Sequence, residues 1–192
     1  MRKQLRLKGI TWLGGLGIFL LLLKVNYDVA VITATLLILG FTLVFDRNKL
    51  WAWIPALSVG IIFVLVIRDM YSSYNVFTLK IRGLMLFPML AWALMLMFWY
   101  LVVEPYFHHD KWWRKWLTNA ALFCAGLIVF EIIGYHVLGV RLGAGSTYPG
   151  WPVLDIFHAP WWMQVAYFFN GIAFIVVVAF VDNILRRRTG KS

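Results

Sequence analysis

One carboxylic acid, Glu131, lies inside a long apolar stretch of the chain, Leu117–Val140. Hydrocarbon disfavours the ionised form of a carboxyl group, so an acid at this position is expected to keep its proton near neutral pH. A desolvated and still protonated carboxylic acid is the group that general-acid catalysis requires. The same side chain could instead hydrogen-bond a neighbouring helix as a structural link, and the sequence leaves both interpretations open.

A second polar pair, Asp155 and His158, stands just before Pro160 and the last apolar stretch. If the segment after Pro152 forms a helical turn, the three-residue spacing projects both side chains to one side. They could then act as an acid–base pair or as two metal ligands. Two spaced ligands do not make a metal site, so we predict no metal and no cofactor.

Helical geometry selects the neighbours of Glu131. Tyr135, four residues later, shares its face, whereas His136 is rotated by about 140° and is expected to be an ordinary hydrogen-bonded histidine near the interface. The last apolar stretch carries a second polar line at three-residue spacing, formed by Gln164, Tyr167 and Asn170. Facing Glu131, this line would form a polar slot that binds substrate; routine interhelical hydrogen bonding is the alternative.

Another group of polar residues lies in the loop after the fourth apolar stretch. Glu104 and His108 have helical spacing, and His109 follows directly, but Pro105 disfavours continuing the preceding helix past Glu104. A solvated loop flanked by basic residues is therefore favoured over a metal site there. The other acidic residues fall at the ends of apolar stretches or in loops, where solvation is expected; they are Asp28, Asp46, Asp69, Asp110, Asp155 and Asp182.

The composition indicates the class of protein that carries these candidate side chains. The 192 residues are 62% hydrophobic and 14% charged, against about 45–50% and 25% in soluble domains, and the mean hydropathy is +0.80. These values exclude a disordered chain, a secreted disulfide scaffold and an ordinary water-soluble enzyme. Cys124 is the only cysteine, so no internal disulfide can form.

The apolar stretches predict an all-α fold, a polytopic membrane helix bundle of about six transmembrane helices. Each stretch approaches the length needed to cross about 30 Å of hydrocarbon. An Asn–Asp turn near residues 24–28 is expected to separate the first two as a tight helical hairpin. We expect a single transmembrane domain over residues 1–192. The stretches are Ile10–Leu23, Val29–Phe45, Leu50–Ile67, Gly83–Val103, Leu117–Val140 and Trp161–Leu185.

The distribution of basic residues predicts the orientation. With six spans, one side of the membrane holds 13 of the 18 Lys and Arg residues, including both chain ends, and the other side holds 5. This bias places both termini in the cytoplasm of a multi-pass protein of the cell membrane. Basic helix ends account for the net charge of +10, and no basic helix face or motif indicates a nucleic-acid partner.

One segment, Phe130–Met163, carries a family resemblance. It contains the pattern Glu-x-x-Gly-x-His-x-x-Gly, then a Gly-x-Pro stretch that leads into a Trp-Trp-Met start of the last span. This arrangement resembles the integral-membrane carotenoid-biosynthesis family, which includes the 1′-hydratases of acyclic carotenoids. The resemblance implies an enzyme that acts on an isoprenoid double bond.

The residues and the resemblance together predict an enzyme that modifies a membrane lipid or isoprenoid, such as a carotenoid, by acid catalysis. Glu131 would protonate an apolar carbon, and Tyr135 and Tyr167 would line the site. Asp155 or His158 would activate water. A non-enzymatic subunit or assembly factor of a larger membrane complex is the alternative, with a small transporter third; a homo-oligomer is compatible with each.

Overall fold

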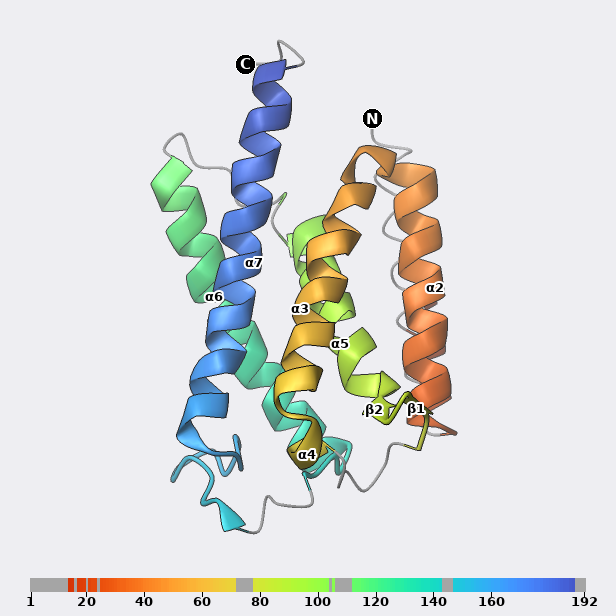
Figure 1. The fold of residues 1–192 in the computed structure, drawn as a ribbon, viewed down its shortest axis with the longest axis vertical. Helices are drawn as coiled ribbons and strands as arrows, with labels where there is room; N and C mark the ends of the chain where they lie inside the picture. Colours follow the sequence, from red (N-terminus) through yellow and green to blue (C-terminus); the bar gives the residue numbers. More distant parts are fainter. Residues whose placement is uncertain are drawn as a thin grey trace. The chain divides into compact units, whose positions relative to one another are not determined.

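The structure is a computed structural model that describes residues 14–15, 17–19, 21–23, 25–71, 78–103, 105, 112–142 and 147–188. Within this part of the chain, helices dominate and five of them are long and apolar enough to cross a membrane (Figure 1). The predicted all-α membrane helix bundle is therefore confirmed. The five segments are Tyr27–Phe45, Arg47–Val66, Leu86–Val103, Trp116–Val137 and Trp161–Ile184.

The first predicted span, Ile10–Leu23, lies partly outside the described residues, and its described positions, 14–15, 17–19 and 21–23, are helical. The predicted break after it is present. The backbone amides of Val25 and Asn26 both donate to the carbonyl of Leu22, at 3.0 and 2.9 Å. A new helix, α2 (Tyr27–Phe45), begins directly afterwards, and the Asn26 side chain caps it by accepting from the amide of Val29 at 3.1 Å.

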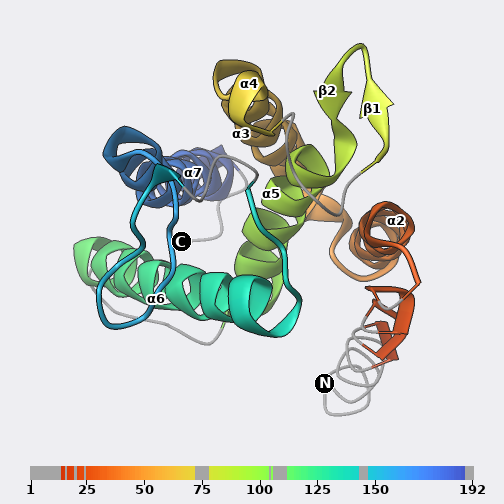
Figure 2. The same ribbon diagram turned by 90° about the horizontal axis from the view of Figure 1, so that it is seen from below.

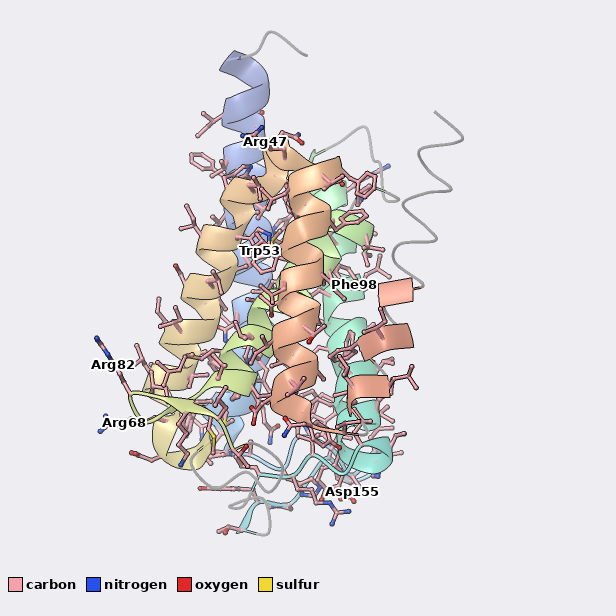
Figure 3. All side chains as sticks on the ribbon, turned by 90° about the vertical axis from the view of Figure 1, so that its right-hand side faces the viewer. Arg47, Trp53, Arg68, Arg82, Phe98 and Asp155 are labelled. Atoms are coloured by element: carbon pink, nitrogen blue, oxygen red, sulfur yellow. The ribbon has the colours of Figure 1, made fainter. Side chains whose placement is uncertain are left out.

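Contacts between backbone segments divide the chain into two units, and one domain over residues 1–192 stays a prediction. The first unit comprises Met1–Val66 and Val76–Met97, and the second comprises Ile67–Asn75 and Phe98–Ser192. In the first unit, α2 is followed by η1 (Arg47–Ala52), α3 (Trp53–Val66) and most of α5 (Leu86–Phe98). Arg47 and Arg82, both in this unit, lie at opposite ends of it (Figure 3).

A short β-hairpin, absent from the sequence-based prediction, precedes α5. Its strands are β1 (Lys80–Ile81) and β2 (Leu84–Met85), paired antiparallel (Figure 2). The two residues between them, Arg82 and Gly83, both have positive φ, 50° and 81°. Two such residues are typical of the tight turn whose twist matches that of paired strands.

Asp28 attaches α2 to the segment that leads into this hairpin. Its Oδ2 accepts hydrogen bonds from the amide of Thr78 at 2.9 Å, the Thr78 hydroxyl at 3.0 Å and the amide of Leu79 at 3.0 Å. Asp28 is only 4% exposed. The expectation that Asp28 is a solvated residue at a span end is wrong, because a partner 50 residues away in the sequence folds over it.

The second unit contains the helices that position the candidate site. Its described elements are α4 (Arg68–Tyr71), η2 (Trp99–Val103), α6 (Trp112–Ile132), η4 (Ile133–Val137) and α7 (Trp161–Arg188). Helices α6 and α7 lie side by side (Figure 1). Asp182 of α7, also expected to be solvated, accepts the hydroxyl of Tyr100 on both carboxylate oxygens at 2.9 Å.

The packing of α6 against α7 depends on the absence of a side chain at Gly171 of α7. A β-carbon at Gly171 would overlap the ring of Phe123, which is itself 1% exposed. That ring also meets Trp99 edge-to-face, with centroids 5.7 Å apart. The ring of Phe123 on α6 therefore packs directly against the backbone of α7 at Gly171. Small residues allow such close helix packing in membrane bundles.

Candidate functional site

Glu131 lies near the end of α6 and lines a cavity of about 30 Å³, here called the inner cavity. Such a volume corresponds to about one water molecule. Within the described part of the chain, no group hydrogen-bonds the Glu131 carboxyl, so the interhelical bond that the structural interpretation requires is not found there. The other residues around the inner cavity are Tyr135, Val140, Leu142, Phe157, His158, Ala159 and Tyr167.

The end of α6 widens into a π-helical turn, η4 (Ile133–Val137), directly after the acid. The amide of Leu138 donates to the carbonyl of Ile133, five residues back, at 2.9 Å. Insertions of this kind occur often at functional sites because they redirect the side chains that follow. Here Tyr135 lines the inner cavity together with Glu131, in agreement with the shared face that the sequence predicts.

His136 points elsewhere, as its helical position predicts. It is exposed, and its Nε2 lies 2.9 Å from the carbonyl oxygen of Leu154 in the α6–α7 loop. This contact makes His136 a hydrogen-bonded histidine that fastens the loop to the end of α6. It does not line the inner cavity.

His158 is held from both sides of its ring. Its Nδ1 lies 3.1 Å from the carbonyl oxygen of Tyr148, and its Nε2 lies 3.0 Å from Oδ1 of Asp155. The Asp155 carbonyl is a further acceptor at 3.2 Å from Nε2. The predicted pairing of Asp155 with His158 is therefore present. Because acceptors face both nitrogens, only a ring that carries both protons can donate to each of them.

The imidazole also lines the cavity that contains the half-buried Glu131. His158 stacks on Tyr135, with ring centroids 4.5 Å apart and an interplanar angle of 14°. The Asp155 side chain is 67% exposed and that of His158 15%. The Asp155–His158 pair thus reaches from solvent to the wall of the inner cavity that Glu131 also lines.

A larger pocket of about 660 Å³, here called the outer pocket, adjoins the same histidine. Tyr135, Leu142 and His158 line both spaces and so form the wall that they share. Arg141 lines the outer pocket only, and its guanidinium carbon lies 4.9 Å from the centroid of the Tyr135 ring. Such a volume is in the range of sites for small ligands.

The α6–α7 loop takes its shape from an unusual backbone and one amide side chain. Asp155 and Phe157 have φ of 48° and 57°, values that non-glycine residues rarely adopt. The Oε1 of Gln164 accepts from the indole of Trp151 at 2.9 Å. Its Nε2 donates to the carbonyls of Phe157 at 3.0 Å and Ala159 at 2.8 Å. Gln164 thereby fastens the loop to the first turns of α7.

The three polar residues predicted to line one face of the last span, Gln164, Tyr167 and Asn170, lie in different surroundings in α7. Tyr167 is buried and lines the inner cavity with Glu131. Gln164 is engaged with the loop, and its contact with substrate stays a prediction. Asn170 lines neither space, and its buried Nδ2 finds no hydrogen-bond partner among the residues that the structure describes, where the sequence predicted one inside the bundle.

The other predicted metal candidates can be placed only in part. Glu104, His108 and His109 lie outside the described residues. Among the residues that the structure describes, no three His, Cys, Asp or Glu side chains gather closely enough to hold a metal ion.

Sequence reasoning missed Gly150, which lies against the histidine. A β-carbon there would lie 2.7 Å from Nε2 of His158 and 2.9 Å from the carbonyl oxygen of Ile156. The signal in the sequence was the Gly-x-Pro stretch, which indicated a turn but not what packs on it. The Tyr148 carbonyl, a partner of His158, carried no signal because every residue has one.

We expect Gly150→Ala to displace the His158 ring and to break its contact with Asp155, because backbone on the other side leaves the new methyl group no space. Imidazole nitrogen chemical shifts of ¹⁵N-histidine-labelled protein should show the change for His158 and not for His136. Gly40→Ala is the control, since no atom lies within 4 Å of a β-carbon at that position. Unchanged His158 shifts in Gly150→Ala would contradict the geometry described above.

No family model, curated protein or solved structure matches this chain.

Proposed function

We propose that this protein is a membrane enzyme that protonates a carbon–carbon double bond of an isoprenoid or a similar lipid, with Glu131 as the general acid. The observation that carries the proposal is the state of the Glu131 carboxyl. It lines a cavity with room for about one water molecule, shares that cavity with His158 and has no hydrogen-bond partner among the described residues. A carboxyl group in such surroundings is suited to hold a proton and release it to a substrate.

The groups around the inner cavity supply the remaining parts of a hydration. Glu131 gives its proton to one alkene carbon, and the neighbouring carbon becomes a cation. The aromatic ring of Tyr167 tolerates that cation, and Tyr135, whose ring stacks on His158, lines the cavity beside it. A water molecule then bonds to the cation and releases a proton to the Glu131 carboxylate that the first step left behind. This transfer restores the acid, so the net change is the addition of one water. His158, held by Asp155, lines the cavity in which that water would lie.

The surroundings of the acid support a substrate that arrives through the bilayer. Glu131 belongs to the span Trp116–Val137, and apolar side chains next to it, Phe130 and Ile133, are exposed on the same helix. In a membrane such exposed apolar surface meets acyl chains. The bias of basic residues supports an orientation in the cell membrane with both termini cytoplasmic, and the α6–α7 loop then faces the opposite side.

Comparison of total lipid extracts from cells with and without this gene tests the proposal. We expect a lipid heavier than its precursor by one water molecule, or an isomer of the precursor, only in cells that express the protein. Identical extracts, together with copurification of the chain in fixed proportion with a larger complex in mild detergent, would instead indicate a non-enzymatic subunit.

A further inference from the structure

The outer pocket has a chemical character different from that of the inner cavity. Its cationic side chain is Arg141, whose guanidinium lies over the Tyr135 ring at 4.9 Å. Thr147 and Tyr148 line the same pocket. Asp155 also lines it, but its Oδ1 contacts His158 at 3.0 Å. A planar guanidinium placed on an aromatic face is well suited to bind the oxygens of a phosphate group.

The depth of the pocket agrees with such a ligand. The apolar span ends at Val137, and Arg141 follows four residues later. Basic residues at this position lie at the level of lipid head groups. A phosphate in the outer pocket would therefore lie where the phosphate of an amphiphile lies in the bilayer, with its chain directed into the hydrocarbon.

We propose that the outer pocket binds the phosphate head group of the lipid substrate and that Arg141 is its anchor. The inference rests on the proposed function, because it assigns the substrate class of the same site. It also locates the reacting bond. Glu131 precedes Val137 by six residues, or about 9 Å along the helix, and only the shared wall of Tyr135, Leu142 and His158 separates the two spaces. The double bond that Glu131 protonates therefore belongs to the isoprene units nearest the phosphate.

Calorimetric titration of the full chain in lipid nanodiscs tests the inference with three probes: farnesyl monophosphate, farnesol and inorganic phosphate. We expect the wild-type protein to bind farnesyl monophosphate at least tenfold more tightly than either other probe. Arg141→Gln should reduce the affinity for farnesyl monophosphate to that for farnesol, and Arg141→Lys should give an intermediate value. Arg68→Gln is the matched control, because Arg68 belongs to the same unit, lines neither space and pairs with Asp69 at 3.5 Å.

Equal affinity of the wild-type protein for farnesyl monophosphate and farnesol would overturn the inference. So would unchanged binding in Arg141→Gln. Equal affinity for inorganic phosphate would show a site for soluble anions and would overturn the lipid assignment. Glu131→Gln should bind farnesyl monophosphate as the wild type does, since the head group does not contact Glu131. The head-group site is therefore measured without turnover, and its failure is distinguishable from failure of the proposed acid catalysis.

Discussion

Glu131→Gln is expected to lower product formation by about 10²–10⁴-fold, the usual contribution of a positioned general acid. Glutamine has nearly the same shape and still donates hydrogen bonds, but it does not release a proton to an alkene carbon. The rest of the site should remain in place, because no described group hydrogen-bonds the Glu131 carboxyl and the Asp155–His158 contact does not involve it. Lipid extracts from cells that express the variant, quantified by mass spectrometry at equal protein level, measure the effect.

Asp69→Asn provides the matched control for this measurement. Asp69 is a carboxylate of the same unit, its side chain is 95% exposed, and it lines neither the inner cavity nor the outer pocket. This variant should make product at the wild-type level. Equal lipid profiles for Glu131→Gln and the wild type would contradict the role of Glu131 as acid. Thermal unfolding in detergent should give the same midpoint for both, which separates loss of chemistry from loss of fold.

Gly171→Ala should have the largest effect on stability. The new β-carbon would overlap the ring of Phe123, and that ring is closed in by Trp99, which leaves it little room to move. Overpacking of this kind costs about 1–3 kcal/mol and occasionally more, and we expect the upper end of that range. Unfolding of the purified protein by a denaturing detergent, followed by circular dichroism, measures the change in the free energy of unfolding.

Two further measurements test whether the loss of stability comes from the contact between position 171 and Phe123. Gly40→Ala, in the membrane-spanning helix α2, meets no atom within 4 Å and should not lower the free energy of unfolding; the better helix propensity of alanine should raise it by up to about 1 kcal/mol. Phe123→Ala creates space at the same position, so the double variant with Gly171→Ala should be less destabilised than the sum of the single variants. Strict additivity of the two substitutions would mean that they do not meet, and that α6 and α7 pack by other side chains.

The sequence predicted the spans well because membrane crossing is a property of composition and length. The last predicted span, Trp161–Leu185, agrees with the observed Trp161–Ile184 to within one residue. The pairing of Asp155 with His158 was also predicted, because the two residues are close in sequence. The helical turn that the prediction assumed is not present, since Asp155 and Phe157 have positive φ. Features that depend on a few neighbouring residues could be predicted in this way.

Contacts between segments that are far apart in the sequence could not be predicted. Nothing near Asp28 indicated Thr78, so a buried, triply hydrogen-bonded carboxylate was assigned to solvent. The hairpin at Arg82 and Gly83 has strands of two residues, too short for any alternating pattern. Nothing in the sequence indicated the role of Gly171, because its partner Phe123 lies on another helix and small residues carry no signal of what packs on them.

The attachment of the α6–α7 loop by Gln164 has a mechanical consequence. Through it His158 is carried by α7, whereas Glu131 is carried by α6. Any longitudinal slide or change of tilt between these two helices therefore alters the spacing between imidazole and acid. Helices adjust their tilt to the thickness of the surrounding bilayer. If Glu131 acts as the proposed acid, the rate of its proton transfer is therefore expected to depend on the lipids in which the protein resides.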